Sequence, residues 1–106
     1  MSLSVEQTGP RAFRAAGEID LSNVDLLREP LEGAIDGPGD LTVDLSGVTF
    51  MDSQGIRVVI AIAHLLEGHG RLILLKPSRP VARVFDLMGI AKLGNLVVAD
   101  DVRPDG

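Results

Sequence analysis

The 106-residue chain contains no cysteine, tryptophan or tyrosine, and only three phenylalanines. Without cysteine, neither a disulfide framework nor thiolate metal ligation is available. With so few aromatic side chains, the core has to be built mainly from Val, Ile and Leu. An aliphatic core of this kind suits a sheet covered by helices, in which central strands read as apolar runs.

Long apolar runs are also lacking. The longest uninterrupted one, residues 58–63, falls well short of the ~20 residues that span a bilayer. The first residues lack the basic region and apolar stretch of a signal peptide, so we expect a cytoplasmic protein. The length predicts a single domain over residues 1–106, with a core at about residues 3–99 and a flexible tail at residues 100–106.

Positive charge is sparse and scattered, with ten Lys and Arg against fifteen Asp and Glu and a net charge of −5. Binding to nucleic acid or to an anionic membrane requires a basic patch, so neither is expected. His64 and His69 have no convincing set of further metal ligands, and no phosphate-binding GxxxxGK[ST] loop occurs. We therefore expect no metal, no cofactor and a monomer whose partner is a protein or a small ligand.

The hydrophobic pattern predicts two strands followed by three helix–strand units. Residues 3–8 and 11–18 are expected to form an antiparallel hairpin around the turn at Gly9-Pro10. Strands separated by helices favour parallel pairing through right-handed crossovers. We therefore predict an α/β fold with a mixed, mostly parallel sheet, an N-terminal antiparallel hairpin and helices packed mainly on one side.

The remaining elements are predicted from apolar spacing and from turn residues. Strands are expected at residues 41–45, 71–75 and 96–99, and strand 71–75 is expected to be buried on both faces. A turn is expected at Ser46-Gly47. Helices are expected from a cap at Ser22 to before Gly37, over residues 53–68, and around residues 81–88 with Gly89 just past the end. Pro30 is expected to kink the first helix or to break it near Glu29, because proline removes a backbone hydrogen bond.

The start of the second helix is the most informative segment. Ser53 is predicted to accept hydrogen bonds from the first backbone amides, where the helix dipole would also favour a phosphate. In the alternative, Asp52 is the cap and Ser53 is the first helical residue. Gly55 is a poor helix former in the first turn, which we interpret as room for close approach by another molecule. A serine at a helix start is, however, more often only structural.

Three segments resemble the STAS domain family of anti-sigma factor antagonists and cytoplasmic domains of sulfate transporters. The specific one is Asp44-Leu-Ser-Gly47 followed by Phe50-Met-Asp-Ser-Gln-Gly-Ile56. Gly17-Glu-Ile-Asp20 and the run from Pro80 to Ile90 are weaker matches. The resemblance covers roughly residues 3–99 and implies the STAS fold.

The resemblance also implies a switch. Ser53 would be phosphorylated by a partner kinase that is itself the anti-sigma factor, and a serine phosphatase would remove the phosphate. The unphosphorylated form would capture the anti-sigma factor and free a sigma factor. Together with Asp20, which the family places near the serine, the residues expected at the partner-binding surface are Asn23, Asp52, Gln54, Gly55 and Arg57. The sequence departs from the family's usual small residues at Gln54 and Arg57.

Other interpretations remain open. Asp20, Asn23 and Asp52 could be turn or cap residues only. The chain could be a STAS-type accessory or scaffold subunit of a transport or stress-sensing complex without phosphorylation, or a domain that binds a small molecule or nucleotide at its strand ends. The chain lacks the acidic pair with which a receiver domain binds magnesium. A serine hydrolase would need glycine at the position of Met51. We therefore expect no enzymatic activity.

Overall fold

The fold is given by a computed structural model that describes residues 2–99. Its elements, in chain order, are β1 (Leu3–Gly9), β2 (Ala12–Ile19), α1 (Asp25–Gly33), β3 (Leu41–Met51), α2 (Ser53–Leu66), β4 (Leu72–Leu75), α3 (Arg79–Met88), the short 3-10 helix η1 (Ile90–Lys92) and β5 (Leu96–Ala99). The tail expected at residues 100–106 lies outside the described residues.

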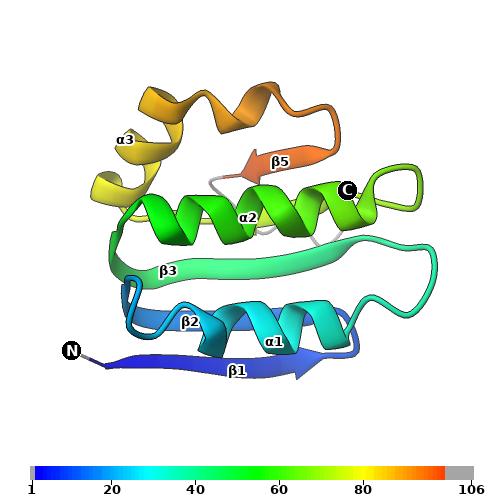
Figure 1. The fold of residues 1–106 in the computed structure, drawn as a ribbon, viewed down its shortest axis with the longest axis horizontal. Coiled ribbons are helices and arrows are strands. Elements are labelled where there is room, and N and C mark those ends of the chain that lie inside the picture. Colours follow the sequence, from blue (N-terminus) through cyan, green and yellow to red (C-terminus); the bar gives the residue numbers. More distant parts are fainter. Residues whose placement is uncertain (1, 100–106) are drawn as a thin grey trace.

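The five strands form one sheet in the order β1-β2-β3-β4-β5, with β1 and β2 antiparallel and the later neighbours parallel. Each parallel strand is added on the same side of the one before it. Right-handed crossovers therefore place the connecting helices on the same face of the sheet. Figure 1 shows α1 and α2 lying across the sheet in this way. The predicted mixed sheet with an antiparallel hairpin is confirmed.

The core lies between the sheet and these helices and is aliphatic. Alternate residues in the first half of β3 point into it, as period-2 strands require. The buried side chains of the central strands and of α2 are Leu41, Val43, Leu45, Leu72, Leu74, Ile56, Val59, Ile62, Ala63 and Leu66. On β4 the outward residues Ile73 and Leu75 are only partly buried. The expected burial of this strand on both faces is therefore wrong, because the helices cover one face only.

The start of α1 differs from the prediction. The helix begins at Asp25, its N-cap is Val24, and no side chain caps it. The hydroxyl of Ser22 instead donates to Oδ1 of Asp20 over 2.6 Å, so Ser22 belongs to the preceding turn. The helix also continues through Pro30 to Gly33 and is not broken near Glu29. Apolar residues on both sides of the proline are buried, so packing holds this segment against the core.

No turn occurs at Ser46-Gly47, because β3 runs without interruption from Leu41 to Met51. Its register with β2 shifts twice, so that β3 carries extra residues opposite Ala16 and Glu18. Such bulges bend a strand and increase its twist. The carboxylate of Asp44 accepts the backbone N–H of Ser46 over 2.8 Å at the first of them. The turn-forming residues thus produce a bulge within a strand that continues.

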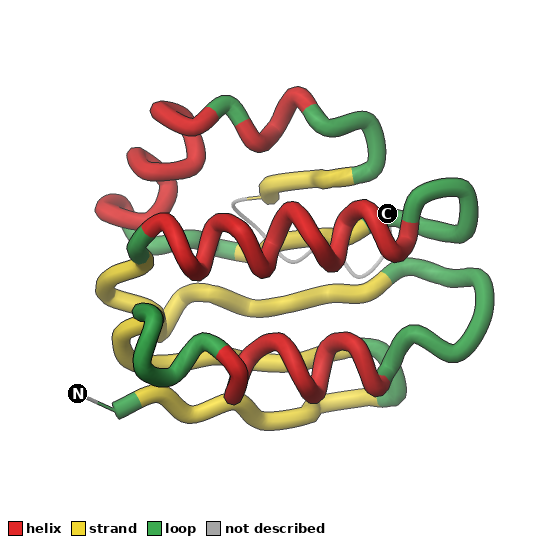
Figure 2. Tube along the Cα trace, in the orientation of Figure 1, coloured by secondary structure: helices red, strands yellow, loops and turns green. Residues whose placement is uncertain are grey.

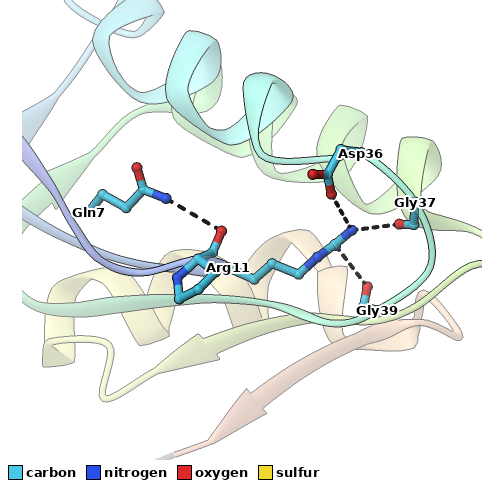
Figure 3. Close-up of polar contacts among 6 residues, drawn as sticks. Gln7, Arg11, Asp36, Gly37 and Gly39 are labelled. Carbon is cyan, nitrogen blue, oxygen red and sulfur yellow. Dashed lines mark hydrogen bonds and ion pairs between the residues drawn. The ribbon is translucent and has the colours of Figure 1, made fainter.

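Arg11 fixes the end of the sheet that lies opposite the first turn of α2. Figure 3 shows its guanidinium reaching the loop between α1 and β3, where it contacts the carboxylate of Asp36 over 3.0 Å. It also donates to the backbone oxygens of Gly37 (2.6 Å) and Gly39 (3.3 Å). Figure 2 shows this long loop beside the β1–β2 turn. One side chain therefore ties the hairpin to the glycine-rich connection before β3.

Candidate functional site

The ends of β2 and β3 bring the candidate residues together at one edge of the sheet. Ile19 pairs with Met51, and the backbone N–H of Asp52 donates to the carbonyl of Ile19 over 3.1 Å. Since both strands run in parallel, Asp20 and Ser53 follow them at the same edge. In Figure 1 this is the edge where α2 begins and where the loop after β2 turns into α1.

Asp52 is the N-cap of α2. Its backbone is extended, and its Oδ1 accepts the N–H groups of Gln54 (2.8 Å) and Gly55 (3.3 Å). The first prediction, in which Ser53 caps the helix, is wrong, and the alternative with Ser53 as first helical residue is confirmed. Aspartate is a strong cap because its carboxylate satisfies amides that have no partner within the helix. The helix start therefore does not depend on the Ser53 hydroxyl.

Ser53 is exposed at this helix start. Within residues 2–99 its hydroxyl makes no hydrogen bond, in contrast to the hydroxyls of Ser22 and Ser78. β4 pairs only with residues 41–44 of β3, so the second half of β3 and the start of α2 extend beyond it. The hydroxyl is thus accessible and has no structural partner in the described part of the chain.

Packing explains why a glycine stands at position 55, and this explanation differs from our interpretation of the sequence. The residue is buried, and a Cβ built on it would lie 2.4 Å from Cγ of Met51 and 3.0 Å from Cγ2 of Ile19. Such distances are too short for side chains to coexist. The glycine lets α2 pack against the ends of β2 and β3, so the expectation that it admits another molecule is wrong.

Asp20 lies in a loop held by its own hydrogen bonds. Its carboxylate accepts both the hydroxyl (2.6 Å) and the N–H (2.9 Å) of Ser22, and these bonds lower the pKa of Asp20. Asn23 accepts the N–H of Asp20 over 3.0 Å and donates to the carbonyl of Glu18 over 2.8 Å. Asn23 is only 8% exposed, so its amide shapes the loop from inside.

Gln54 and Arg57 complete the predicted set on α2. Gln54 is partly buried beside Ser53, whereas Arg57 is exposed one turn further along the helix. The structure thus gathers Asp20, Asp52 and Ser53 at one edge and continues that surface to Arg57. It does not place Gly55 on the surface.

Two large apolar side chains at this edge were missed from the sequence. Leu21, next to Asp20, is 71% exposed, and Phe50, two residues before Asp52, is 47% exposed. Strand alternation could have identified Phe50, because Met51 points inward and its neighbour must then point outward. Large exposed apolar residues beside polar ones are typical of surfaces that bind proteins.

Within residues 2–99, no group of three or more His, Cys, Asp and Glu residues is arranged to hold a metal ion. None of the helices described is long and apolar enough to cross a bilayer.

The described residues thus form a small α/β fold with helices on one face of an open sheet and an exposed serine after a capping aspartate. The STAS domain family model matches residues 3–102, and this chain belongs to that family. The coverage spans nearly the whole sequence and includes every candidate residue named above.

Relatives of the chain are named as anti-sigma factor antagonists. The chain is 36% identical over 81 residues to the anti-sigma F factor antagonist of Lysinibacillus sphaericus, covering 74% of this chain and 69% of that protein. It is 31% identical over 98 residues to the anti-sigma-B factor antagonist of Staphylococcus aureus (strain NCTC 8325 / PS 47), covering 88% and 91%.

Solved structures support the same relation. The unphosphorylated form of the anti-sigma factor antagonist SpoIIAA aligns with a TM-score of 0.71 and 26% identity, over 94% of this chain and 90% of that one. The phosphorylated form of the Bacillus cell fate determinant SpoIIAA aligns with a TM-score of 0.62 and 25% identity, over 94% and 93%. The chain therefore shares its fold with a protein solved in both phosphorylation states.

Proposed function

We propose that this chain is an anti-sigma factor antagonist controlled by reversible phosphorylation of Ser53. The observation that carries the proposal is the exposed Ser53 hydroxyl, which makes no hydrogen bond within residues 2–99, while Asp52 caps the helix. A modifying enzyme can therefore reach the hydroxyl without unfolding α2. The names of the relatives support the choice of partner, an anti-sigma factor.

The proposed switch consists of two reactions, phosphorylation of Ser53 and hydrolysis of the phosphate ester. An anti-sigma factor with serine kinase activity transfers the γ-phosphoryl group of ATP to Oγ of Ser53, the hydroxyl proton is released to solvent, and ADP leaves. A serine phosphatase later uses water to hydrolyse the ester, releasing inorganic phosphate and restoring the hydroxyl. In this proposal the chain is a kinase substrate and a binding module in the cytoplasm, and catalyses no reaction itself.

The binding surface would centre on Ser53, with Leu21 and Phe50 as apolar contacts and Asp20 and Gln54 as polar ones. Aromatic and aliphatic anchors with a polar rim are typical of such interfaces. Asn23, Asp52 and Gly55 would act indirectly, by holding the loop and the helix that present this surface. Arg57 would extend it along α2.

Phosphorylation would weaken binding through charge. A phosphoserine adds about −1.5 to −2 charges at neutral pH, next to the carboxylates of Asp20 and Asp52. A partner packed against the neutral hydroxyl would then face a hydrated dianion. A 100-fold loss of affinity requires only about 2.7 kcal/mol, which crowding, repulsion and desolvation at an interface can supply.

The proposal is tested by affinity capture from lysate of the source cells with Ser53→Ala and Ser53→Asp baits, and an exposed serine elsewhere, Ser4→Ala, as matched control. We expect Ser53→Ala and Ser4→Ala to retain an ATP-binding protein that phosphorylates the wild-type chain at Ser53, and Ser53→Asp to lose it. Equal capture of transport or stress-complex subunits by all baits would instead support a scaffold role. Capture of no protein, with thermal stabilisation by a nucleotide, would support a ligand-binding domain.

A further inference from the structure

Arg57 lies one helical turn after Ser53 on α2, and both side chains are exposed. Residues four apart on a helix are surface neighbours, with Cβ atoms about 5–6 Å apart. The exposed face continues along the helix through Ala61 to His64. A long arginine side chain at this spacing can reach a group attached to Ser53 without any movement of the backbone.

Arg57 is also uncommitted in the described part of the chain. Four other arginines, Arg11, Arg14, Arg28 and Arg71, have carboxylates within 4 Å. Within residues 2–99 no such carboxylate lies near Arg57, so its guanidinium donors are available. A planar guanidinium matches phosphate oxygens in a bidentate geometry.

The immediate surroundings of Ser53 otherwise disfavour a phosphate. The N–H groups of Gln54 and Gly55, which an anion at a helix start would use, already donate to Asp52. The carboxylates of Asp52 and Asp20 are at the same edge. Two further exposed cations lie near the carboxyl ends of the strands, Lys76 directly after β4 and Arg79 at the start of α3, but both belong to other elements. Arg57 is the cation on α2 itself.

We propose that Arg57 binds the phosphate when Ser53 is phosphorylated, as a charge-assisted pair on the surface of α2. This inference rests on the proposed function and deepens it. Phosphorylation would then change two features of the partner-binding surface together: the neutral hydroxyl becomes an anion, and the positive charge of Arg57 is no longer available to a partner.

The test uses the full chain with phosphoserine incorporated at position 53 during translation, so that no kinase is needed. A phosphorus NMR titration measures the second pKa of the phosphate, ordinarily about 6. A neighbouring cation favours the dianion and lowers this pKa. We expect Arg57→Gln to raise it by about 0.3, the shift that corresponds to a pair four residues apart on a helix. Arg57→Lys should restore part of the lowering, and 1 M NaCl should reduce the difference.

The matched control is Arg14→Gln, which removes an exposed positive charge from β2. Its neighbours Phe13 and Ala15 point into the core, so Arg14 lies on the sheet face away from α2. We expect this variant to titrate like the wild type. The inference is overturned if Arg57→Gln leaves the phosphate pKa unchanged, or if Arg14→Gln shifts it equally. Because the phosphate is installed directly, this result is independent of whether a kinase modifies Ser53 in the cell.

Discussion

At the scale of single residues, Gly55 is a position in the site at which a side chain would collide with its neighbours. Its position leaves no space for a side chain, because Met51 and Ile19 occupy that volume. A methyl group would gain about 1 kcal/mol of helix propensity but would force overpacking that costs about 1–3 kcal/mol. Such a site is fixed by packing between α2 and the strand ends, independently of any partner.

We therefore predict that Gly55→Ala lowers the free energy of unfolding by about 1 kcal/mol. Gly33→Ala is the matched control, since Gly33 is also helical and a Cβ there would meet nothing within 4 Å. That variant should be unchanged or slightly stabilised. Urea unfolding of both variants is the measurement, and equal stability of Gly55→Ala and the wild type would contradict the packing explanation.

The carboxylate of Asp20 provides a second residue-level prediction. The hydroxyl and N–H of Ser22 lower its pKa in the folded chain. A lowered folded pKa stabilises the fold above the unfolded pKa, and this contribution is lost as the pH falls through the folded pKa. We predict that Ser22→Ala raises the pKa of Asp20 toward its ordinary value and lowers stability at pH 7, but not at a pH where Asp20 is protonated.

The measurement is an NMR titration of the Asp20 carboxyl carbon in Ser22→Ala. Ser4→Ala, at an exposed serine of β1, should leave that titration unchanged. An unaltered Asp20 pKa in Ser22→Ala would show that the hydroxyl is not the cause of the lowering.

At the scale of elements, α2 is presented by its cap. Asp52 is the last residue before the helix, and its carboxylate accepts two amides of the first turn. We predict that Asp52→Ala lowers the free energy of unfolding by about 0.5–2 kcal/mol, the ordinary cost of losing such a cap. Asp52→Asn keeps an accepting oxygen and should lose much less. Denaturant unfolding compares them, and full stability of Asp52→Ala would contradict this assignment.

The elements also show what could be predicted from the sequence. Alternation, a continuous apolar run, turn residues and helical spacing identified the five strands and three α-helices of residues 2–99, and Gly89 has the left-handed backbone (φ 66°) expected after α3. Ser46-Gly47 was misinterpreted, because the same residues that make turns also make bulges inside a strand. The break expected near Glu29 is absent, since the helix-breaking tendency of Pro30 yields to packing of the residues around it.

The site followed from the sequence only in part. The spacing of Asp52 and Ser53 at a helix start located it, but two neighbouring residues compete for the cap, and only three-dimensional geometry decides between them. The closeness of Asp20 to Asp52 depends on strand register, which a bulged strand conceals. The exposure of Leu21 depends on the loop path. Gly55 required knowledge of Ile19, which is distant in the sequence.

At the scale of the whole molecule, the proposed switch would need no change of fold. Ser53 is exposed, Asp52 caps α2 without help from the Ser53 hydroxyl, and Arg57 lies on the same face of the helix as Ser53. We predict that phosphorylation of Ser53 shifts amide NMR resonances only around the β2–α1 loop, the end of β3 and the first two turns of α2. Large shifts throughout α1, α2 and α3 would contradict a local mechanism. Ser53→Ala is the control for loss of the hydroxyl alone.

In the proposed switch, a phosphate group added at Ser53 controls binding to the partner. The most direct test is a binding isotherm of the captured kinase with the unmodified chain and with the chain phosphorylated at Ser53, in the same buffer and salt. We predict that phosphorylation raises the Kd about 100-fold or more, equivalent to about 2.7 kcal/mol. Equal Kd values for the two forms would contradict the account.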